Sequence, residues 1–225
     1  MKQKDELLTY LAKSVVEKKS IPSIPQLSQE LGISTASVRE QLEVARRLGI
    51  VDVKPKVGIQ AKALSLTEPL LTALNYGIAV DSSIFDQFAD LRKHLELSYW
   101  YESVSLLVRS DIDKLQMLVD QAWNRIQGHP MQNPEREHRE FHLSFFKRLE
   151  NPVVISLLEA YWTRYHKVGV TQLMNREYLI SVWNYHQQMV DALRDREFEK
   201  GYNALLTHMD LVKQVRKAVL KQRFE

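Results

Sequence analysis

The 225-residue chain contains no cysteine, and it has only seven glycines and seven prolines. Without cysteine there is no disulfide framework, no zinc ribbon and no thiol catalysis. Long apolar runs are also missing, so we expect neither a signal peptide nor a transmembrane span. A hydrophobic content of 44% supports a packed core. The sequence therefore predicts a cytoplasmic protein with no membrane partner, built from one large domain or two smaller ones.

Positive charge is concentrated near the N-terminus. Residues 1–65 hold 11 Lys and Arg against 7 Asp and Glu, whereas residues 66–225 hold 20 against 21. A basic segment is expected of a part that meets phosphate, although a mildly basic solvated surface would look the same.

The first sixty residues predict a compact helix-turn-helix with a wing. Apolar residues at helical spacing indicate a first helix over 4–18. A short second helix ends at Gly32, and Ser34 is a good N-cap for a longer third helix. Two short strands follow at 50–53 and 59–61, with a turn between them.

In this arrangement the second helix of the motif enters the major groove of DNA by its N-terminal end. Arg39 on that helix can reach guanine or a phosphate, and lysines flank the wing tip, where they can hold the DNA backbone. The candidate DNA-binding residues are therefore Thr35, Ala36, Ser37, Arg39, Lys54, Lys56 and Gly58. Arg46 and Arg47 are interpreted instead as a favourable charge pair at the C-terminus of the helix. A winged helix used for protein contacts is the alternative.

The rest of the chain is predicted to be helical, with few glycines to interrupt it. We expect helices near 67–79, 82–107, 111–127, 134–149, 152–168, 176–195 and 197–221. The predicted fold class is mainly α. Residues 1–64 would form a winged helix-turn-helix DNA-binding domain, and residues 65–225 an all-α effector-binding and dimerisation domain with a metal site.

Four histidines are the strongest candidates for a binding site in the helical part. His138 precedes His142 by one helical turn, which places the two side chains on one face, roughly 5–6 Å apart at Cβ. They could bind one metal ion, with His186 and His208 as further ligands from neighbouring predicted helices.

The N-terminal motifs resemble the GntR family of bacterial transcription regulators, and the matching residues are 27–34, 37–42, 48–51, Pro55 and Gly58. The family often has a basic residue where Thr35 stands, and its FadR-type members often have another Arg near Pro25. Because both are absent, Arg39 is the surest DNA contact that the resemblance implies.

Residues 82–215 resemble the FadR-type C-terminal (FCD) domain, a bundle of about seven helices that binds effectors. The matching residues are Arg92, Glu96, Phe141, His142, Asn151, Pro152, His186, Ala192, Leu193 and His208. In many members an Asp and three His hold a metal. The resemblance places His142, His186 and His208 at the three His positions and His138 at the Asp position, whereas His94, His129 and His166 match no ligand position.

Four neutral imidazoles suit zinc or nickel better than magnesium or calcium. They also leave the full +2 charge of the ion, so an anionic effector would gain electrostatically. Arg92 would then bind the carboxylate of the effector in a bidentate pair. Its competing role is an ion pair with Glu96, at helical spacing.

Three rival interpretations remain open at this stage. An enzyme is the first, but the run from His138 to His142 lacks the Glu directly after the first His that a metalloprotease needs, and no catalytic residue is assigned. The second is a regulator whose signal is the metal itself. The third keeps DNA binding and makes the helical part only a dimerisation module.

The sequence thus favours a ligand-responsive, metal-containing transcription regulator that is not an enzyme. We expect a homodimer whose two heads bind a palindromic double-stranded DNA operator. The effector would be a small molecule, an organic acid, and its binding would shift the population of two packing states.

Overall fold

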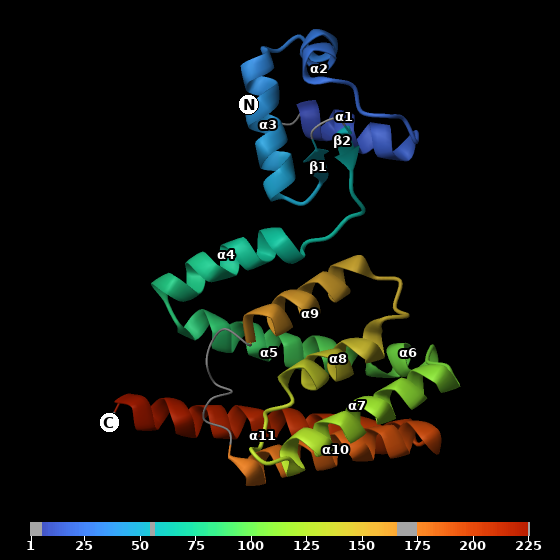
Figure 1. The fold of residues 1–225 in the computed structure, drawn as a ribbon, viewed down its shortest axis with the longest axis vertical. Helices are drawn as coiled ribbons and strands as arrows, with labels where there is room; N and C mark the ends of the chain where they lie inside the picture. Colours follow the sequence, from blue (N-terminus) through green and yellow to red (C-terminus); the bar gives the residue numbers. More distant parts are fainter. Residues whose placement is uncertain (1–5, 55–56, 166–174, 225) are drawn as a thin grey trace. The chain divides into compact units, whose positions relative to one another are not determined.

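The computed structural model describes residues 6–54, 57–165 and 175–224, and for residues 212–224 it describes the backbone helix only. The chain divides into two compact units, 1–76 and 77–225. Figure 1 shows the order of the elements along the chain. The division falls within helix α4 (Thr67–Val80), whereas the boundary expected from the sequence precedes that helix.

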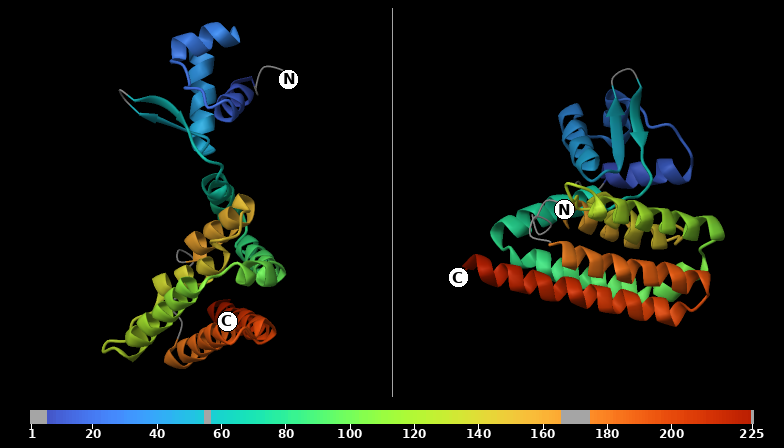
Figure 2. Two further views of the ribbon diagram at one scale, coloured as in Figure 1. Left: turned by 90° about the vertical axis from the view of Figure 1, so that its right-hand side faces the viewer. Right: turned by 60° about the horizontal axis from the view of Figure 1, so that its bottom comes forward.

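The N-terminal unit contains helices α1 (Glu6–Val16), α2 (Ile24–Leu31) and α3 (Thr35–Arg47) and strands β1 (Val51–Lys54) and β2 (Gly58–Ala61). The two strands form an antiparallel hairpin in which Val51 pairs with Ala61 and Lys54 with Gly58 (Figure 2). This is the winged helix-turn-helix predicted from the sequence.

Local capping explains the boundaries of the two helices of the motif. Gly32 follows α2 in the left-handed region, with φ of 67°, where a residue without Cβ is least strained. The Ser34 hydroxyl then accepts a hydrogen bond from the Ser37 amide and begins α3, as predicted. A separate small core lies beneath these helices; its fully buried members include Leu7, Leu11, Leu27 and Val38.

The C-terminal unit is a bundle of helices. The bounds are α5 (Ser83–Ser98), α6 (Trp100–Ser105), α7 (Arg109–Gln127), α8 (Glu135–Phe146), α9 (Pro152–Tyr165), α10 (Arg176–Arg194) and α11 (Phe198–Phe224). Helices α10 and α11 lie side by side and antiparallel, as do α7 and α8 (Figures 1 and 2). The mainly α fold class with a C-terminal helical bundle is confirmed.

The single helix predicted over residues 82–107 is wrong, because the structure has two helices there. Tyr99 separates them, with φ of −90° and ψ of 3°. The break lets the Trp100 side chain turn inward, where it is fully buried and its indole N–H donates to the Phe198 carbonyl at 2.9 Å. The end of α5 therefore coincides with a tertiary contact.

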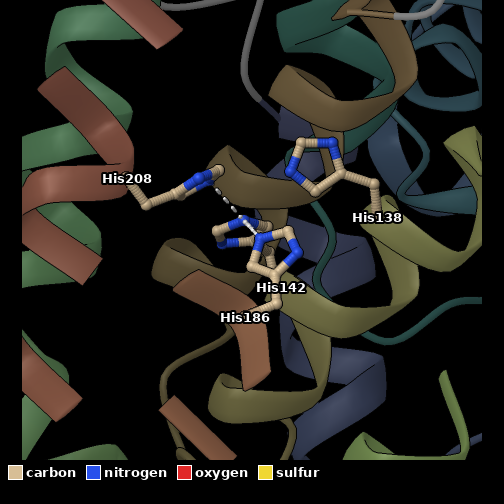
Figure 3. Close-up of side chains that lie close together, drawn as sticks. All are labelled: His138, His142, His186 and His208. Carbon is tan, nitrogen blue, oxygen red and sulfur yellow. Dashed lines mark hydrogen bonds between the residues drawn. The ribbon is translucent and has the colours of Figure 1, made fainter. Parts of the chain in front are cut away.

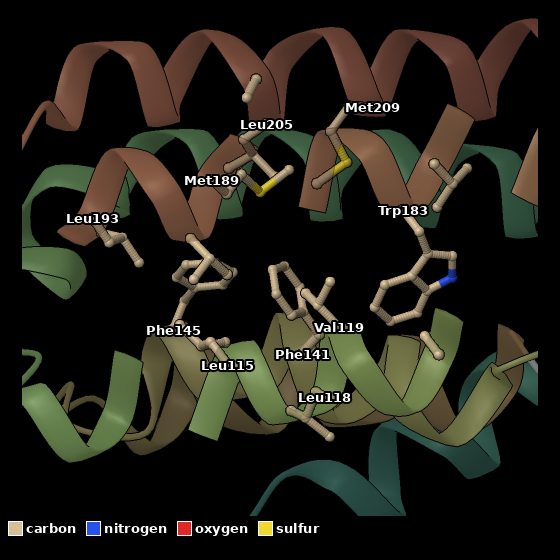
Figure 4. Packing of buried hydrophobic residues seen from close by; sticks show 14 of the residues in the cluster. Leu115, Leu118, Val119, Phe141, Phe145, Trp183, Met189, Leu193, Leu205 and Met209 are labelled. Atoms are coloured by element: carbon tan, nitrogen blue, oxygen red, sulfur yellow. The ribbon is translucent and has the colours of Figure 1, made fainter. Parts of the chain in front are cut away.

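The core of this unit is aromatic and aliphatic, and it is built from the facing sides of α7, α8, α10 and α11 (Figure 4). Phe141 and Phe145 of α8 meet Trp183 and Met189 of α10, and all four are at most 1% exposed. Burial of one such side chain contributes on the order of 1.5–3 kcal/mol. This packing fixes the register of α8 against α10 and so places the histidines that the two helices carry.

Candidate metal centre and DNA-binding surface

The four predicted ligands converge in the interior of the C-terminal unit. His138 and His142 come from successive turns of α8, His186 from α10 and His208 from α11 (Figure 3). One ring nitrogen of each lies within 4.8 Å of one from every other. The last three side chains are fully buried and His138 is 9% exposed. A buried cluster of four histidines is unusual, since polar groups are costly to bury unless other groups compensate them.

Three of the rings point the same nitrogen at a common centre. His142 Nε2 lies 3.2 Å from His208 Nε2 and 3.3 Å from His186 Nε2. A zinc ion with Zn–N distances of about 2.0–2.1 Å in tetrahedral geometry separates its nitrogen ligands by about 3.3–3.4 Å. The spacing of these nitrogens therefore fits a small divalent ion.

The opposite nitrogen of His142 fixes which tautomer is present. Its Nδ1 lies 2.8 Å from Glu96 Oε2, and Glu96 is fully buried. A carboxylate only accepts, so Nδ1 carries the proton and Nε2 keeps its lone pair for a metal. Arg92 Nη2 is also near, at 3.1 Å from Nδ1, but both groups are donors and the contact is longer.

The Nδ1 atoms of His186 and His208 are buried and have no hydrogen-bond partner among the described residues. Among the three fully buried rings, only that of His142 therefore has a hydrogen-bond acceptor on its Nδ1 within the described residues. Sequence reasoning did not assign Glu96 to His142. The Arg-x-x-x-Glu spacing was the available signal, and it indicated only the ion pair.

The protonation state of the cluster suits a metal site. Burial lowers the pKa of His142 well below its ordinary value, and the positive charge of Arg92 lowers it further. Burial likewise lowers the pKa of His186 and of His208, and the neighbouring imidazoles add to the effect. The three rings are therefore neutral at pH 7, which is the state in which imidazole binds a metal.

Arg92, expected to hold the carboxylate of an effector, is occupied by Glu96. Its Nε donates to Glu96 Oε1 at 2.6 Å, and the side chain is 3% exposed. The guanidinium also lies over the rings of Tyr161 and Trp162, at 4.8 and 4.4 Å from their centroids. The structure thus places Arg92 in the competing ion-pair role that the sequence left open.

His138 lies beside the other three rings, with ring centroids 5.0 Å from His142 and 4.9 Å from His186. It also lines a small cavity on the α8–α10 side, together with Tyr178 and Trp183. The histidines without an assigned ligand position lie elsewhere: His94 and His129 are exposed, and His166 lies outside the described residues.

The DNA-binding candidates that the structure describes lie on α3 and on the hairpin. Thr35, Ala36 and Arg39 are exposed, and Ser37 is half-buried with its hydroxyl accepting from Gln41. The Arg39 side chain makes no hydrogen bond or ion pair within the described part of the chain. Its guanidinium is therefore available to a base edge or a phosphate.

Arg46 and Arg47, by contrast, both bind Glu43, at 2.7 and 3.0 Å, at the far end of α3. This placement matches their interpretation as structural charges.

In the hairpin, Lys54 pairs with Asp52 at 3.1 Å, a contact that the sequence reasoning did not foresee. Gly58 is the first residue of β2, next to the turn, and has a φ of 92°. Lys56 lies outside the described residues.

Comparison with known proteins agrees with both parts of the architecture. The sequence profile of the FCD domain matches residues 87–211, and the profile of the LexA DNA binding domain matches residues 1–58. No curated protein matches the chain in sequence.

Solved structures share the fold. Streptococcus agalactiae GntR aligns with a TM-score of 0.68 at 17% identity, over 94% of this chain and 97% of that one. E. coli McbR/YncC aligns with a TM-score of 0.53 at 20% identity, over 90% and 87% of the two chains. Lar of Listeria monocytogenes, described as controlling expression of the agr system, gives 0.52 at 13% identity, over 95% and 96%.

A winged helix-turn-helix joined to a bundle of this kind defines a DNA-binding transcription regulator with an effector-binding domain. The chain belongs to the FCD domain family, within the FadR-type branch of the GntR regulators. This membership places it among regulators and not among enzymes. Within the described residues, no helix is long and apolar enough to cross a membrane.

Proposed function

We propose that the protein is a ligand-responsive regulator that senses a small organic acid at a divalent metal held by His142, His186 and His208, with His138 as fourth ligand. The observation that carries this proposal is the convergence of three buried Nε2 atoms at 3.2–3.3 Å. Zinc or nickel suits an all-imidazole site. The working unit would be a cytoplasmic homodimer that binds a palindromic operator.

Hydrogen-bond accounting supports a metal at this point. With its Nδ1–H directed to Glu96, His142 offers one lone pair, which can accept only one N–H. Two further rings nevertheless point Nε2 at it. A metal ion would satisfy all three lone pairs at once, which neutral rings alone cannot do.

The charges around the site support an anionic effector. Arg92 and Glu96 form a buried pair whose charges offset each other. Four neutral imidazoles add no charge, so a bound ion would present its full +2 in a medium of low dielectric constant. A bound divalent ion would supply an electrophilic centre for one carboxylate oxygen.

The cavity lined by His138 indicates how an effector would change the protein. Its volume is about 10 Å³, which is enough for roughly one water molecule. The Tyr178 hydroxyl beside it is buried and has no hydrogen-bond partner among the described residues, and burial raises the pKa of this phenol, so it stays a donor. An effector larger than water must displace side chains of α8 and α10, which would couple binding to helix packing.

The first test is metal content. The chain, expressed with zinc and nickel supplied, is expected to contain one divalent ion per chain by elemental analysis. His208→Ala should abolish it, and His94→Ala, which alters an exposed histidine on α5, should not. Metal content near zero in the parent, or unchanged metal in His208→Ala, would exclude the site.

A metal-responsive regulator is the second candidate, and the small size of the cavity favours it. If the metal is the signal, operator binding should change when the ion is removed by a chelator and return when it is restored, without an organic acid. If the metal is resident, it should survive dialysis, and operator binding should change only when a carboxylate is added.

A further inference from the structure

A second cavity opens at the far end of the bundle from the first turn of α8. It is a cleft of about 470 Å³ between the end of α6, the start of α7, the end of α10 and the start of α11. Small-molecule sites have volumes of roughly 300–1,000 Å³. None of its residues belongs to the histidine cluster: on α10, Leu193 lies seven residues beyond His186, which is roughly 10 Å along the helix.

The cleft combines an apolar floor with a basic rim. Val104 and Leu193 in the floor are 3% and 2% exposed, and Ile112 and Phe198 beside them are half-buried. Three arginines and one aspartate carry the charge of the rim: Arg109, Arg194, Arg196 and Asp113. The cleft therefore suits a molecule with an apolar body and a negative group.

Arg196 occupies a backbone position that favours glycine. Its φ is 60°, in the left-handed region, and the turn is closed by the Glu197 amide donating to the Ala192 carbonyl at 2.8 Å. Glycine is the usual residue here because it has no Cβ. The Arg196 side chain makes no hydrogen bond or ion pair within the described residues, so no side-chain contact made there explains its presence.

Arg109 at the start of α7 is likewise exposed and unpaired within the described residues. Two other basic residues near the start of α7, Arg148 and Lys147, both bind the Asp111 carboxylate. Arg194 lies 4.0 Å from Asp191 at the C-terminus of α10, where it also complements the helix dipole. Arg109 and Arg196 are therefore the cations that a ligand would meet.

The walls of the cleft are fixed before a ligand arrives. The Trp100 indole donates to the Phe198 carbonyl at 2.9 Å, and Gly201 lies so close to Trp100 that a Cβ there would be 2.6 Å from the ring. On the other wall, Asp111 accepts from the Val108 amide at 3.0 Å and so caps α7. A preformed cleft reduces the entropy lost on binding.

We propose that this cleft is a second ligand site, which binds an amphipathic organic anion. The apolar body would lie on Val104 and Leu193, and the acid group would accept hydrogen bonds from Arg109 and Arg196. Guanidinium groups suit this role because they donate two parallel hydrogen bonds to an acid group.

The test uses two fluorescent probes with the full chain: 8-anilinonaphthalene-1-sulfonate and its uncharged relative N-phenyl-1-naphthylamine. The parent should bind the sulfonate saturably, at one site per chain. Arg196→Gly should weaken sulfonate binding roughly tenfold or more, because one charge-assisted contact is lost. It should not lower the melting temperature, because glycine suits the turn, and it should leave binding of the uncharged probe unchanged.

Lys18→Gly is the matched control. Lys18 is the other non-glycine residue with positive φ in the described chain, at 54°, and it lies in the N-terminal unit. This change also removes one cation from a left-handed position, and sulfonate affinity should stay at the parent value. Arg109→Gln should weaken binding of the sulfonate as Arg196→Gly does. His208→Ala should leave this binding unchanged, which separates the cleft from the metal centre.

Unchanged sulfonate affinity in both Arg196→Gly and Arg109→Gln would overturn the proposal. Equal weakening in Lys18→Gly would assign the effect to overall charge and overturn it too. A change in oligomeric state of Arg196→Gly by light scattering, with no change in sulfonate binding, would show that the cleft is an interface between copies instead.

Discussion

Glu96→Gln tests directly how the metal centre is held. Glu96 Oε1 accepts from Arg92 at 2.6 Å, and Oε2 accepts from His142 Nδ1 at 2.8 Å. Glutamine has the same shape but one amide in place of an oxygen. If the amide faces His142, it donates to Nδ1, which moves the ring proton to Nε2 and blocks metal binding. If it faces Arg92, two donors meet.

Two magnitudes follow. Loss of the acceptor that orients a metal-binding histidine typically weakens metal binding by about 10–100-fold, or about 1.4–2.7 kcal/mol. The metal-free protein should also lose about 3–5 kcal/mol of unfolding free energy, because Arg92 stays buried without its partner charge. The rings of Tyr161 and Trp162 still face the guanidinium, so we expect the lower end of that range.

Competition with a chromophoric chelator measures the zinc affinity, and urea unfolding of the metal-free protein measures the stability. Glu140→Gln is the control: it lies on α8 with His138 and His142, but its side chain is 37% exposed and pairs with Arg136. Equal zinc affinities for the parent, Glu96→Gln and Glu140→Gln would refute the assigned tautomer of His142.

Four further predictions concern the two parts of the protein. Arg39→Ala should weaken specific operator binding by roughly 1–3 kcal/mol in a salt-controlled assay, whereas Arg46→Ala, whose arginine is bound to Glu43, should have little effect; equal affinities of parent and Arg39→Ala would exclude the contact. Changing Lys54 and Lys56 to Gln should lower the log–log salt slope by about 1–2 units, and an unchanged slope would mean that the wing does not meet phosphate. His138→Asp should retain metal but weaken binding of an anionic effector, because it places a negative charge beside the ion; tighter binding would contradict the charge argument. The metal-free protein should lose thermal stability as the pH falls below about 6.5. Burial lowers the pKa values of His142, His186 and His208, so the unfolded chain takes up protons that the folded chain does not. A melting temperature that stays constant between about pH 7 and 5 would argue against neutral buried rings.

The winged helix-turn-helix could be predicted because its signals are local. Gly32 and Ser34 end one helix and begin the next through contacts within a few residues, and such contacts are visible in sequence. The end of α5 at Ser98 could not be predicted in the same way. Neither Gly nor Pro marks it, and the Trp100–Phe198 hydrogen bond that accompanies it joins residues 98 positions apart.

The candidate metal site could likewise be predicted only in part. The one-turn spacing of His138 and His142 placed them on one face, but their approach to His186 and His208 depends on the packing of α8 against α10 and α11. The sequence offered these two histidines as ligands from neighbouring predicted helices, and the family resemblance supported that choice. Nothing in a single sequence could have shown that the unpaired Arg109 and Arg196, 87 positions apart, share one cleft.

Arg92 shows why a residue type at the right position does not by itself define a role. The sequence offered it two partners, an effector carboxylate and Glu96, and both are acid groups that a guanidinium binds equally well. In the structure, the acid group bound to Arg92 is that of Glu96, which is fully buried and directs its second oxygen at His142. An effector that took Arg92 would have to separate this pair, which would leave a carboxylate buried without its cation. The same step would free Glu96 to move relative to His142. An acid effector would therefore be more easily accommodated in the cavity beside His138, where the Tyr178 hydroxyl has no partner among the described residues, than at Arg92.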